Sequence, residues 1–220
     1  MVVLVLAAHP DDEILGAGGT LARHALAGDE VHAVVVSEGA GSRYGDDMVA
    51  KLQAQARCAS IEIGFAALRL EGLPDQRLET LPLIELTQRF EAVVEELRPD
   101  TVYTHFPEDV NSDHGVVARA AWTACRPYRA PFVRNFLVFE TPSSTEWAWP
   151  LTGSAFAPNH YVDITETLDA KVRAMACYES ELREYPHPRS ERALRERAAF
   201  WGSRIGRVAA EPFCVLREIR

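Results

Sequence analysis

Residues 2–13 read VVLVLAAHPDDE, so a continuous apolar run ends directly in a polar cluster. A valine-rich run of this kind is typical of a strand that is buried on both faces of a sheet. We expect a short helix over residues 16–26, ended by Gly28 and Asp29. A strand, a polar cluster and a helix in this order predict the first part of a βαβ unit.

The same alternation continues along the chain of 220 residues. Further strands are predicted over residues 31–37, 67–70, 101–104, 136–139, His160–Asp163 and 213–216, and helices over residues 46–64, 81–97 and 114–124, with two more in the C-terminal part. Strands separated by helix-length segments favour parallel βαβ connections. The fold expected is therefore α/β, a Rossmann-like and mostly parallel sheet flanked by helices. A small C-terminal addition would pack on the same core, which makes residues 1–220 a single domain.

Composition excludes several classes of partner. The chain carries 23 basic and 32 acidic residues, a formal net charge of −9, and this disfavours binding to nucleic acid or to anionic lipid. The longest apolar run is far shorter than the roughly 20 residues that a membrane helix needs. It also lacks the preceding positive charge of a signal peptide. We expect a cytoplasmic protein without a membrane-spanning segment.

The four cysteines are Cys58, Cys125, Cys177 and Cys214. They are widely spaced and form no Cys-x-x-Cys pair, so they do not match a sulfur metal site. Buried free thiols are the interpretation that we prefer over a disulfide framework.

Two polar clusters follow predicted strands. His9, Asp11 and Asp12 come directly after the first strand, and a second cluster, residues 107–114, follows the strand at 101–104. Ligands of open parallel sheets bind beyond the carboxyl ends of the strands, so the two clusters are expected to meet there.

The residue types in these clusters suit a catalytic metal. Hydrolytic zinc sites use three protein ligands, commonly two imidazoles and a carboxylate, which His9, Asp12 and His114 would supply. Zinc is expected, with another divalent transition metal possible. Asp11 would then be the general base, because a metal lowers the pKa of a water molecule that it binds to about 7. The alternative is structural: the first cluster could form an Asx turn and the second could cap a helix.

The sequence also resembles a known family, the LmbE-like or PIG-L zinc-dependent N-acetylglucosaminyl deacetylases. The similarity covers nearly the whole chain and rests on residues 8–13, Gly16–Thr20, residues 37–39, residues 98–100, residues 109–114, and the closing positions Gly202, Gly206 and 210–213. The resemblance implies that the protein removes the acetyl group from an N-acetylated amino sugar or its conjugate. It also implies the same ligands, His9, Asp12 and His114, and the same base, Asp11.

One position departs from the family. Many members carry a histidine three residues before the final ligand, where it stabilises an oxyanion or protonates the leaving group, whereas this chain has Asn111. Asparagine donates a hydrogen bond but cannot carry the charge. His105 or His187 could replace the imidazole, or Asn111 could suffice. Asp113 is expected to orient a ligand or Asn111, which is the usual role of a carboxylate behind a metal site.

The substrate is expected to be a small amino-sugar conjugate. Arg43 could bind a phosphate or a hydroxyl group, and Trp147 could stack on a sugar ring. The proline-rich run 183–189 could close over an anionic conjugate. Two other interpretations stay open: a sugar- or nucleotide-binding module that has lost catalysis, and a phosphate cradle at Gly16–Thr20. The resemblance also makes a homo-oligomer plausible.

Overall fold

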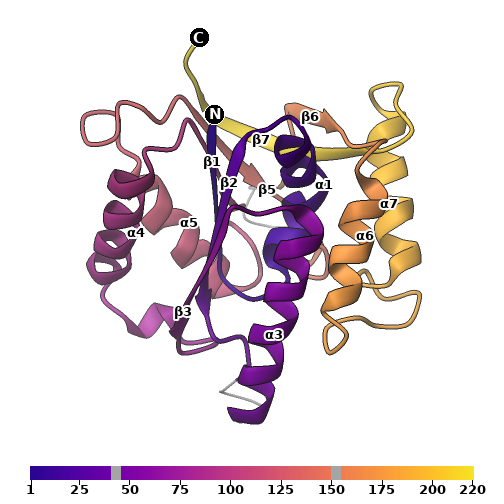
Figure 1. Ribbon diagram of the computed structural model, residues 1–220, viewed down its shortest axis with the longest axis horizontal. Coiled ribbons are helices and arrows are strands. Elements are labelled where there is room, and N and C mark those ends of the chain that lie inside the picture. Colours follow the sequence, from indigo (N-terminus) through magenta and orange to yellow (C-terminus); the bar gives the residue numbers. More distant parts are fainter. Residues whose placement is uncertain (41–45, 150–154) are drawn as a thin grey trace.

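The computed structural model describes residues 1–40, 46–149 and 155–220 (Figure 1). Its centre is a seven-stranded sheet in the order β3-β2-β1-β4-β5-β7-β6. The strands are β1 (Val2–Ala7), β2 (Glu30–Ser37), β3 (Ala67–Leu73), β4 (Thr101–His105), β5 (Asn135–Phe139), β6 (His160–Asp163) and β7 (Ala210–Glu218). The pairs among the first five strands are parallel, and β7 runs antiparallel to both β5 and β6. The mostly parallel α/β fold predicted from the sequence is confirmed.

Helices cover both faces of the sheet (Figure 1). They are α1 (Asp12–Leu26), α3 (Asp46–Ile63), α4 (Leu83–Leu97), α5 (Ser112–Ala124), α6 (Leu168–Cys177) and α7 (Glu191–Ser203), with short 3-10 turns at Leu78–Thr80 and Thr145–Trp147. Helices α4 and α5 lie together on one face, and α1, α3, α6 and α7 lie on the other.

The central position of β1 in the sheet explains why residues 2–8 are continuously apolar. Val3 and Val5 belong to the core beneath α1 and α3, whereas Leu4 and Leu6 belong to the core beneath α4 and α5. Because successive side chains of a strand point to opposite faces, both sets must be apolar when helices cover both sides. The C-terminal strand β7 contributes Phe213 to the first of these cores, so the C-terminal part packs on the same sheet.

Strands β3 and β7 are longer than predicted, and two helices begin earlier than predicted, at polar residues. Helix α1 begins at Asp12, four residues earlier than its apolar pattern predicted, and α5 begins at Ser112, two residues earlier than predicted. Both helices begin with two polar residues, Asp12 and Glu13 in α1 and Ser112 and Asp113 in α5. Apolar periodicity therefore gives no signal there, although these turns carry the functional residues.

The expectation of four free thiols is wrong for one pair. Cys58 and Cys177 form a disulfide that joins α3 to the end of α6, with a Cα–Cα distance of 5.8 Å. The two cysteines are 119 positions apart, and only the packing of α3 against α6 brings them together. Cys125 is free and buried, as expected, whereas Cys214 is free but partly exposed.

The glycine-rich segment lies inside α1, so it does not form a phosphate cradle. The amides of Gly19 and Thr20 donate to the Glu211 carboxylate at 2.9 and 2.7 Å, and Lys171 Nζ donates to that carboxylate at 2.6 Å. A Cβ atom on Gly16 would lie 2.1 Å from Phe139 of β5. The glycines therefore allow close packing of α1.

Within the part of the chain that the structure describes, none of the helices combines the length and apolar character needed to span a membrane.

Candidate metal centre

Strands β1 and β4 are neighbours, and their adjacency builds the site. Val3 to Leu6 of β1 pair in parallel with Thr101 to Thr104 of β4. The chain passes from β1 outward to β2 and β3, and then returns to the other side of β1 through β4. This reversal is a topological switch point, where open α/β sheets bind ligands. The two polar clusters therefore converge, as predicted.

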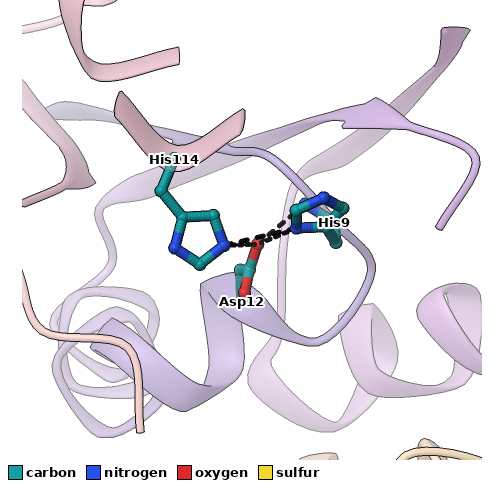
Figure 2. Close-up of side chains that lie close together, drawn as sticks. All are labelled: His9, Asp12 and His114. Carbon is teal, nitrogen blue, oxygen red and sulfur yellow. Dashed lines mark hydrogen bonds and ion pairs between the residues drawn. The ribbon is translucent and has the colours of Figure 1, made fainter. Parts of the chain in front are cut away.

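Three buried side chains meet at this point (Figure 2). His9 Nδ1 lies 3.0 Å from Asp12 Oδ2, and His114 Nε2 lies 3.3 Å from each of these two atoms. Ligand atoms that bind zinc tetrahedrally at about 2.0–2.1 Å lie about 3.3 Å from one another. The spacing and the donor set of two imidazoles and a carboxylate therefore fit a divalent metal ion.

A carboxylate lies beside the second ring nitrogen of each imidazole. Asp113 Oδ2 lies 3.1 Å from His9 Nε2, and Asp109 Oδ2 lies 3.3 Å from His114 Nδ1. The second contact is close but is not aligned as a hydrogen bond. Asp109 is fixed in turn by Thr145, whose hydroxyl donates to it at 2.6 Å. A carboxylate on the second ring nitrogen orients a metal-binding histidine and leaves its other nitrogen for the metal.

The buried carboxylates around the two imidazoles govern the pKa values of these groups. Burial lowers the pKa of His9, but hydrogen bonds to Asp113 and Asp12 outweigh burial and raise that pKa to about 10. Burial likewise opposes the charge of His114, yet the Asp12 charge and the Asp109 contact raise its pKa to about 9. Burial would raise the pKa of Asp12, but the His114 charge and hydrogen bonds from His114 and His9 keep it well below its ordinary value. The carboxylates of the cluster thus favour positive charge at this position.

Asp11 occupies a distinct position beside the ligands. It precedes α1 with φ 111°, a left-handed conformation that costs energy in a residue other than glycine. Glu13 Oε2 accepts the Asp11 amide at 3.2 Å, and the Tyr178 hydroxyl donates to Glu13 Oε1 at 2.5 Å. Arg189 Nη1 donates to Asp11 Oδ2 at 3.2 Å. The carboxylate of Asp11 is thus held by Arg189 and is not part of the His9, Asp12 and His114 group.

A cavity of about 600 Å³ opens over these residues. Asp11 has its side chain in this cavity together with the three ligands, and Asn111 and Trp147 also line it. The remaining lining residues are Pro10, Leu15, Gly39, Met48, Asp75, Gln76, Val110, Thr141, Ser143, Ser144, Ser180, Glu181, Arg183 and Arg189. The cavity is large enough for a small molecule, and most of its lining is polar.

Asn111 and Trp147 lie where a substrate could reach them. Asn111 caps α5, and its Oδ1 accepts the amide of Asp113 at 3.0 Å, which leaves the Nδ2 group as a donor. The indole of Trp147 is 56% exposed and lies edge-on to the His187 ring, with centroids 6.4 Å apart.

Neither candidate for the replacement imidazole lines the cavity. His105 is fully buried, stacks on His114 at 4.0 Å between ring centroids, and accepts the Ala8 amide at Nε2. Burial, with the nearby His114 charge, lowers the pKa of His105 to about 3, so it stays neutral. His187 Nδ1 accepts the Arg189 amide at 3.1 Å. Arg43 lies outside the described residues.

Sequence reasoning missed several residues of the site. Asp109 was seen only as part of the motif, while Glu13, Asp75 and Gln76 were assigned no role, although Gln76 Nε2 lies 3.2 Å from His9 Nε2. Arg189 was placed only in the proline-rich run 183–189. It precedes α7 and is 178 positions from Asp11, so no sequence pattern connects the two.

A buried His-Asp-His set at the switch point of a parallel sheet, open to a polar cavity, is a group that could hold a divalent metal ion. Comparison with known proteins identifies the family. The family described as PIG-L, GlcNAc-PI de-N-acetylase, matches residues 4–125, and the chain belongs to this family.

Two curated relatives carry deacetylase names. The uncharacterized deacetylase YaiS of Escherichia coli K12 is 31% identical over 147 residues, which cover 64% of this chain and 75% of that protein. A probable N-acetyl-alpha-D-glucosaminyl L-malate deacetylase 2 of Bacillus cereus is 27% identical over 193 residues, covering 81% of this chain and 83% of the relative.

Solved structures share the fold across the whole chain. The conserved protein TT1542 of Thermus thermophilus has a TM-score of 0.80 at 25% identity, covering 99% of this chain and 96% of its own. The N,N'-diacetylchitobiose deacetylase of Pyrococcus horikoshii has a TM-score of 0.79 at 20% identity, and the match covers 98% of this chain and 84% of that protein. The 4-carboxy-2-hydroxymuconate hydratase GalB of Pseudomonas putida has a TM-score of 0.77 at 22% identity, and the match covers 100% of this chain and 97% of that protein. Because a hydratase shares the fold, the fold alone does not determine the reaction.

Proposed function

We propose that this protein is a zinc-dependent hydrolase that removes the acetyl group from an N-acetylated amino sugar or its conjugate. The observation that carries the proposal is the convergence of His9, Asp12 and His114 at 3.0–3.3 Å, with Asp11 beside them in the same cavity. Membership in the PIG-L family and the names of two relatives support deacetylation.

The metal would be held by His9 Nδ1, Asp12 Oδ2 and His114 Nε2. When bound, a divalent ion supplies Lewis acidity, which polarises an acyl oxygen and makes water more acidic. Asp113 holds the His9 ring and Asp109 lies against the His114 ring, so neither ring must reorganise when the metal binds.

Asp11 would move the proton. Its Oδ2 atom is held by Arg189, and Oδ1 has no hydrogen bond within residues 1–40, 46–149 and 155–220. Oδ1 is therefore available to take a proton from the attacking water and return it to the leaving amine nitrogen. The Nδ2 group of Asn111 would donate to the substrate from the opposite cluster, since Oδ1 of Asn111 already caps α5.

The substrate proposal is an amino-sugar conjugate. Trp147 at the cavity wall offers an aromatic face for a sugar ring, and buried Asp75 offers a carboxylate for hydroxyl groups. We also propose that residues 1–220 form one domain, because β7 completes the sheet that β1 begins. Location in the cytoplasm and assembly into a homo-oligomer remain part of the proposal.

Acetate release tests this function. The purified protein is reconstituted with zinc and incubated with a panel of N-acetylglucosamine glycosides and conjugates, and free acetate and free amine are quantified. We expect Asp11→Asn to keep its zinc and lose about 10²- to 10⁴-fold in turnover. His114→Ala should lose zinc, whereas Asp169→Asn, on the exposed face of α6, should match the wild type.

A second candidate rests on Asn111, which stands where many family members carry a histidine. A module that binds amino sugars without hydrolysing them would bind the panel members, and no acetate would appear with any metal. That result would replace the hydrolase proposal. Wild-type turnover in Asp11→Asn would instead contradict the base assignment alone.

A further inference from the structure

Arg189 brings a permanent positive charge into the cavity. Its Nη1 atom bridges two carboxylates, donating to Asp11 Oδ2 at 3.2 Å and to Glu181 Oε2 at 2.7 Å. The side chain is 22% exposed and lines the same cavity as the metal ligands. The guanidinium is thus anchored by Glu181 while it touches the carboxylate proposed as the base.

Three of the five hydrogen-bond donors of Arg189 have no partner in the part of the chain that the structure describes. A guanidinium has five N–H donors, and the two on Nη1 are engaged by Asp11 and Glu181. The Nε donor is buried and has no partner among the described residues, and Nη2 donates to none of them either. A buried donor without a partner destabilises a protein, so an ion pair with only a structural role would not be expected to leave the buried Nε donor unpaired.

No other group in the described cavity wall combines burial with a fixed positive charge. Arg183 also lines the cavity, but its side chain is 41% exposed and its Nη1 donates to the carbonyls of Ser180 and Leu182. Asn111 is uncharged, and His105 and His187 do not line the cavity. Arg189 is therefore the group placed to receive a negatively charged oxygen beside Asp11.

We propose that Arg189 donates hydrogen bonds to the acyl oxygen of the substrate as negative charge develops on it, and to the carboxylate of the released acid. It would supply the cationic donor that Asn111 lacks. This inference rests on the proposed hydrolase function. In the proposed reaction, Asp11 Oδ1 deprotonates a water molecule and that water attacks the carbonyl carbon. The carbonyl group therefore lies one water molecule away from Asp11, and its oxygen is within reach of the adjoining guanidinium. Arg189 would then be a catalytic residue, and Glu181 the residue that positions it.

Acetate is the probe for this interaction, because it carries the carboxylate of the expected product. Its dissociation constant is measured by NMR titration of the full chain, in both metal-free and zinc-loaded forms. Arg189→Gln should weaken acetate binding about 10- to 100-fold in both forms, the loss expected for charge-assisted hydrogen bonds. Zinc affinity, measured separately, should stay within about threefold, since Arg189 contacts none of the three ligands.

Arg195→Gln is the matched control. Arg195 also bridges two carboxylates, Asp169 at 2.7 Å and Glu191 at 3.1 Å, but on the surface of α7. Its loss removes the same charge and the same kind of ion pair, so acetate binding should not change.

Arg189→Lys keeps the inference testable if Arg189→Gln does not fold. Lysine retains the positive charge next to Asp11 and Glu181 but lacks the planar set of donors. Acetate affinity should still fall about tenfold or more. Wild-type acetate affinity in either folded variant would overturn the inference. If the wild-type protein released no acetate from any conjugate, the function would fail, while the acetate titrations would still decide the role of Arg189.

Discussion

The carboxylate of Asp113 lies 3.1 Å from His9 Nε2, while the opposite ring nitrogen, Nδ1, lies 3.0 Å from Asp12. The His9 ring, itself a proposed metal ligand, therefore contacts Asp12 through one nitrogen and the fully buried Asp113 carboxylate through the other. Asp113 is itself held, because its other oxygen accepts the Leu78 amide at 3.0 Å. This chain of contacts fixes both the orientation of the His9 ring and the nitrogen that faces the metal position.

Asp113→Asn tests that relationship. The amide has the same shape and can keep the Leu78 contact, but it removes the negative charge behind His9. We expect zinc affinity to fall about 10- to 100-fold, measured by competition with a chelating dye. Asp169→Asn is the control for loss of a surface carboxylate. An unchanged zinc affinity would show that Asp113 does not support the ligand.

The sequence predicted the ligands because their signals are local. His9 and Asp12 lie three residues apart after a buried strand, and His114 follows a second strand, so the switch-point rule could join them. Asp113 could be assigned its supporting role for the same reason. The strand pattern also predicted the sheet, since burial on both faces forces continuous apolar runs.

What the sequence could not predict depends on long-range packing. Arg189 reaches Asp11 only because α6 and the loop after it fold back over α1, and Tyr178 reaches Glu13 by the same route. The Cys58–Cys177 pair likewise follows from the contact between α3 and α6. None of these pairs has a periodic or motif signal, so only the tertiary structure reveals them.

Tyr178→Phe should destabilise the protein. Tyr178 and Glu13 are both buried, and the Tyr178 hydroxyl donates to Glu13 Oε1. Without that donor the carboxyl group stays buried with one partner fewer, which costs about 1–3 kcal/mol in the free energy of unfolding. Chemical denaturation would measure the change. Tyr128→Phe is the control because that side chain is fully exposed, and an equal effect of the two substitutions would contradict the argument.

Thiol counting should distinguish the disulfide from four free cysteines. Unfolded in denaturant without reductant, the protein should show two reactive thiols, from Cys125 and Cys214, and four after reduction. Protein purified from a reducing compartment should be oxidised first, so that the pair can form. Four thiols after mild oxidation would mean that Cys58 and Cys177 do not pair.

Loss of the pair should also reduce stability. Cys58→Ser opens a loop of 119 positions, and removing such a crosslink costs about 2–5 kcal/mol. Cys214→Ser is the control, because that thiol is free and partly exposed. Equal unfolding midpoints for the two variants under oxidising conditions would contradict the crosslink.

Gly16→Ala should disturb both stability and the metal site. A Cβ atom there would lie 2.1 Å from Cδ2 of Phe139, whose ring is fully buried and also packs edge-on against His105. Because His105 stacks on His114, a displaced ring would press on a metal ligand. Overpacking of this kind costs about 1–3 kcal/mol, so we expect a lower unfolding midpoint together with weaker zinc binding.

Gly18→Ala is the matched substitution in the same helix. Its added Cβ would lie 3.1 Å from the Ile14 side chain and 3.2 Å from Lys171, so only small movements are needed. Alanine also favours the helix by about 1 kcal/mol relative to glycine, which offsets this crowding. Gly18→Ala should therefore stay within about 1 kcal/mol of the wild type and keep its zinc affinity. If the two variants were equally stable, the contact between Gly16 and Phe139 would not be what holds α1 close to β5.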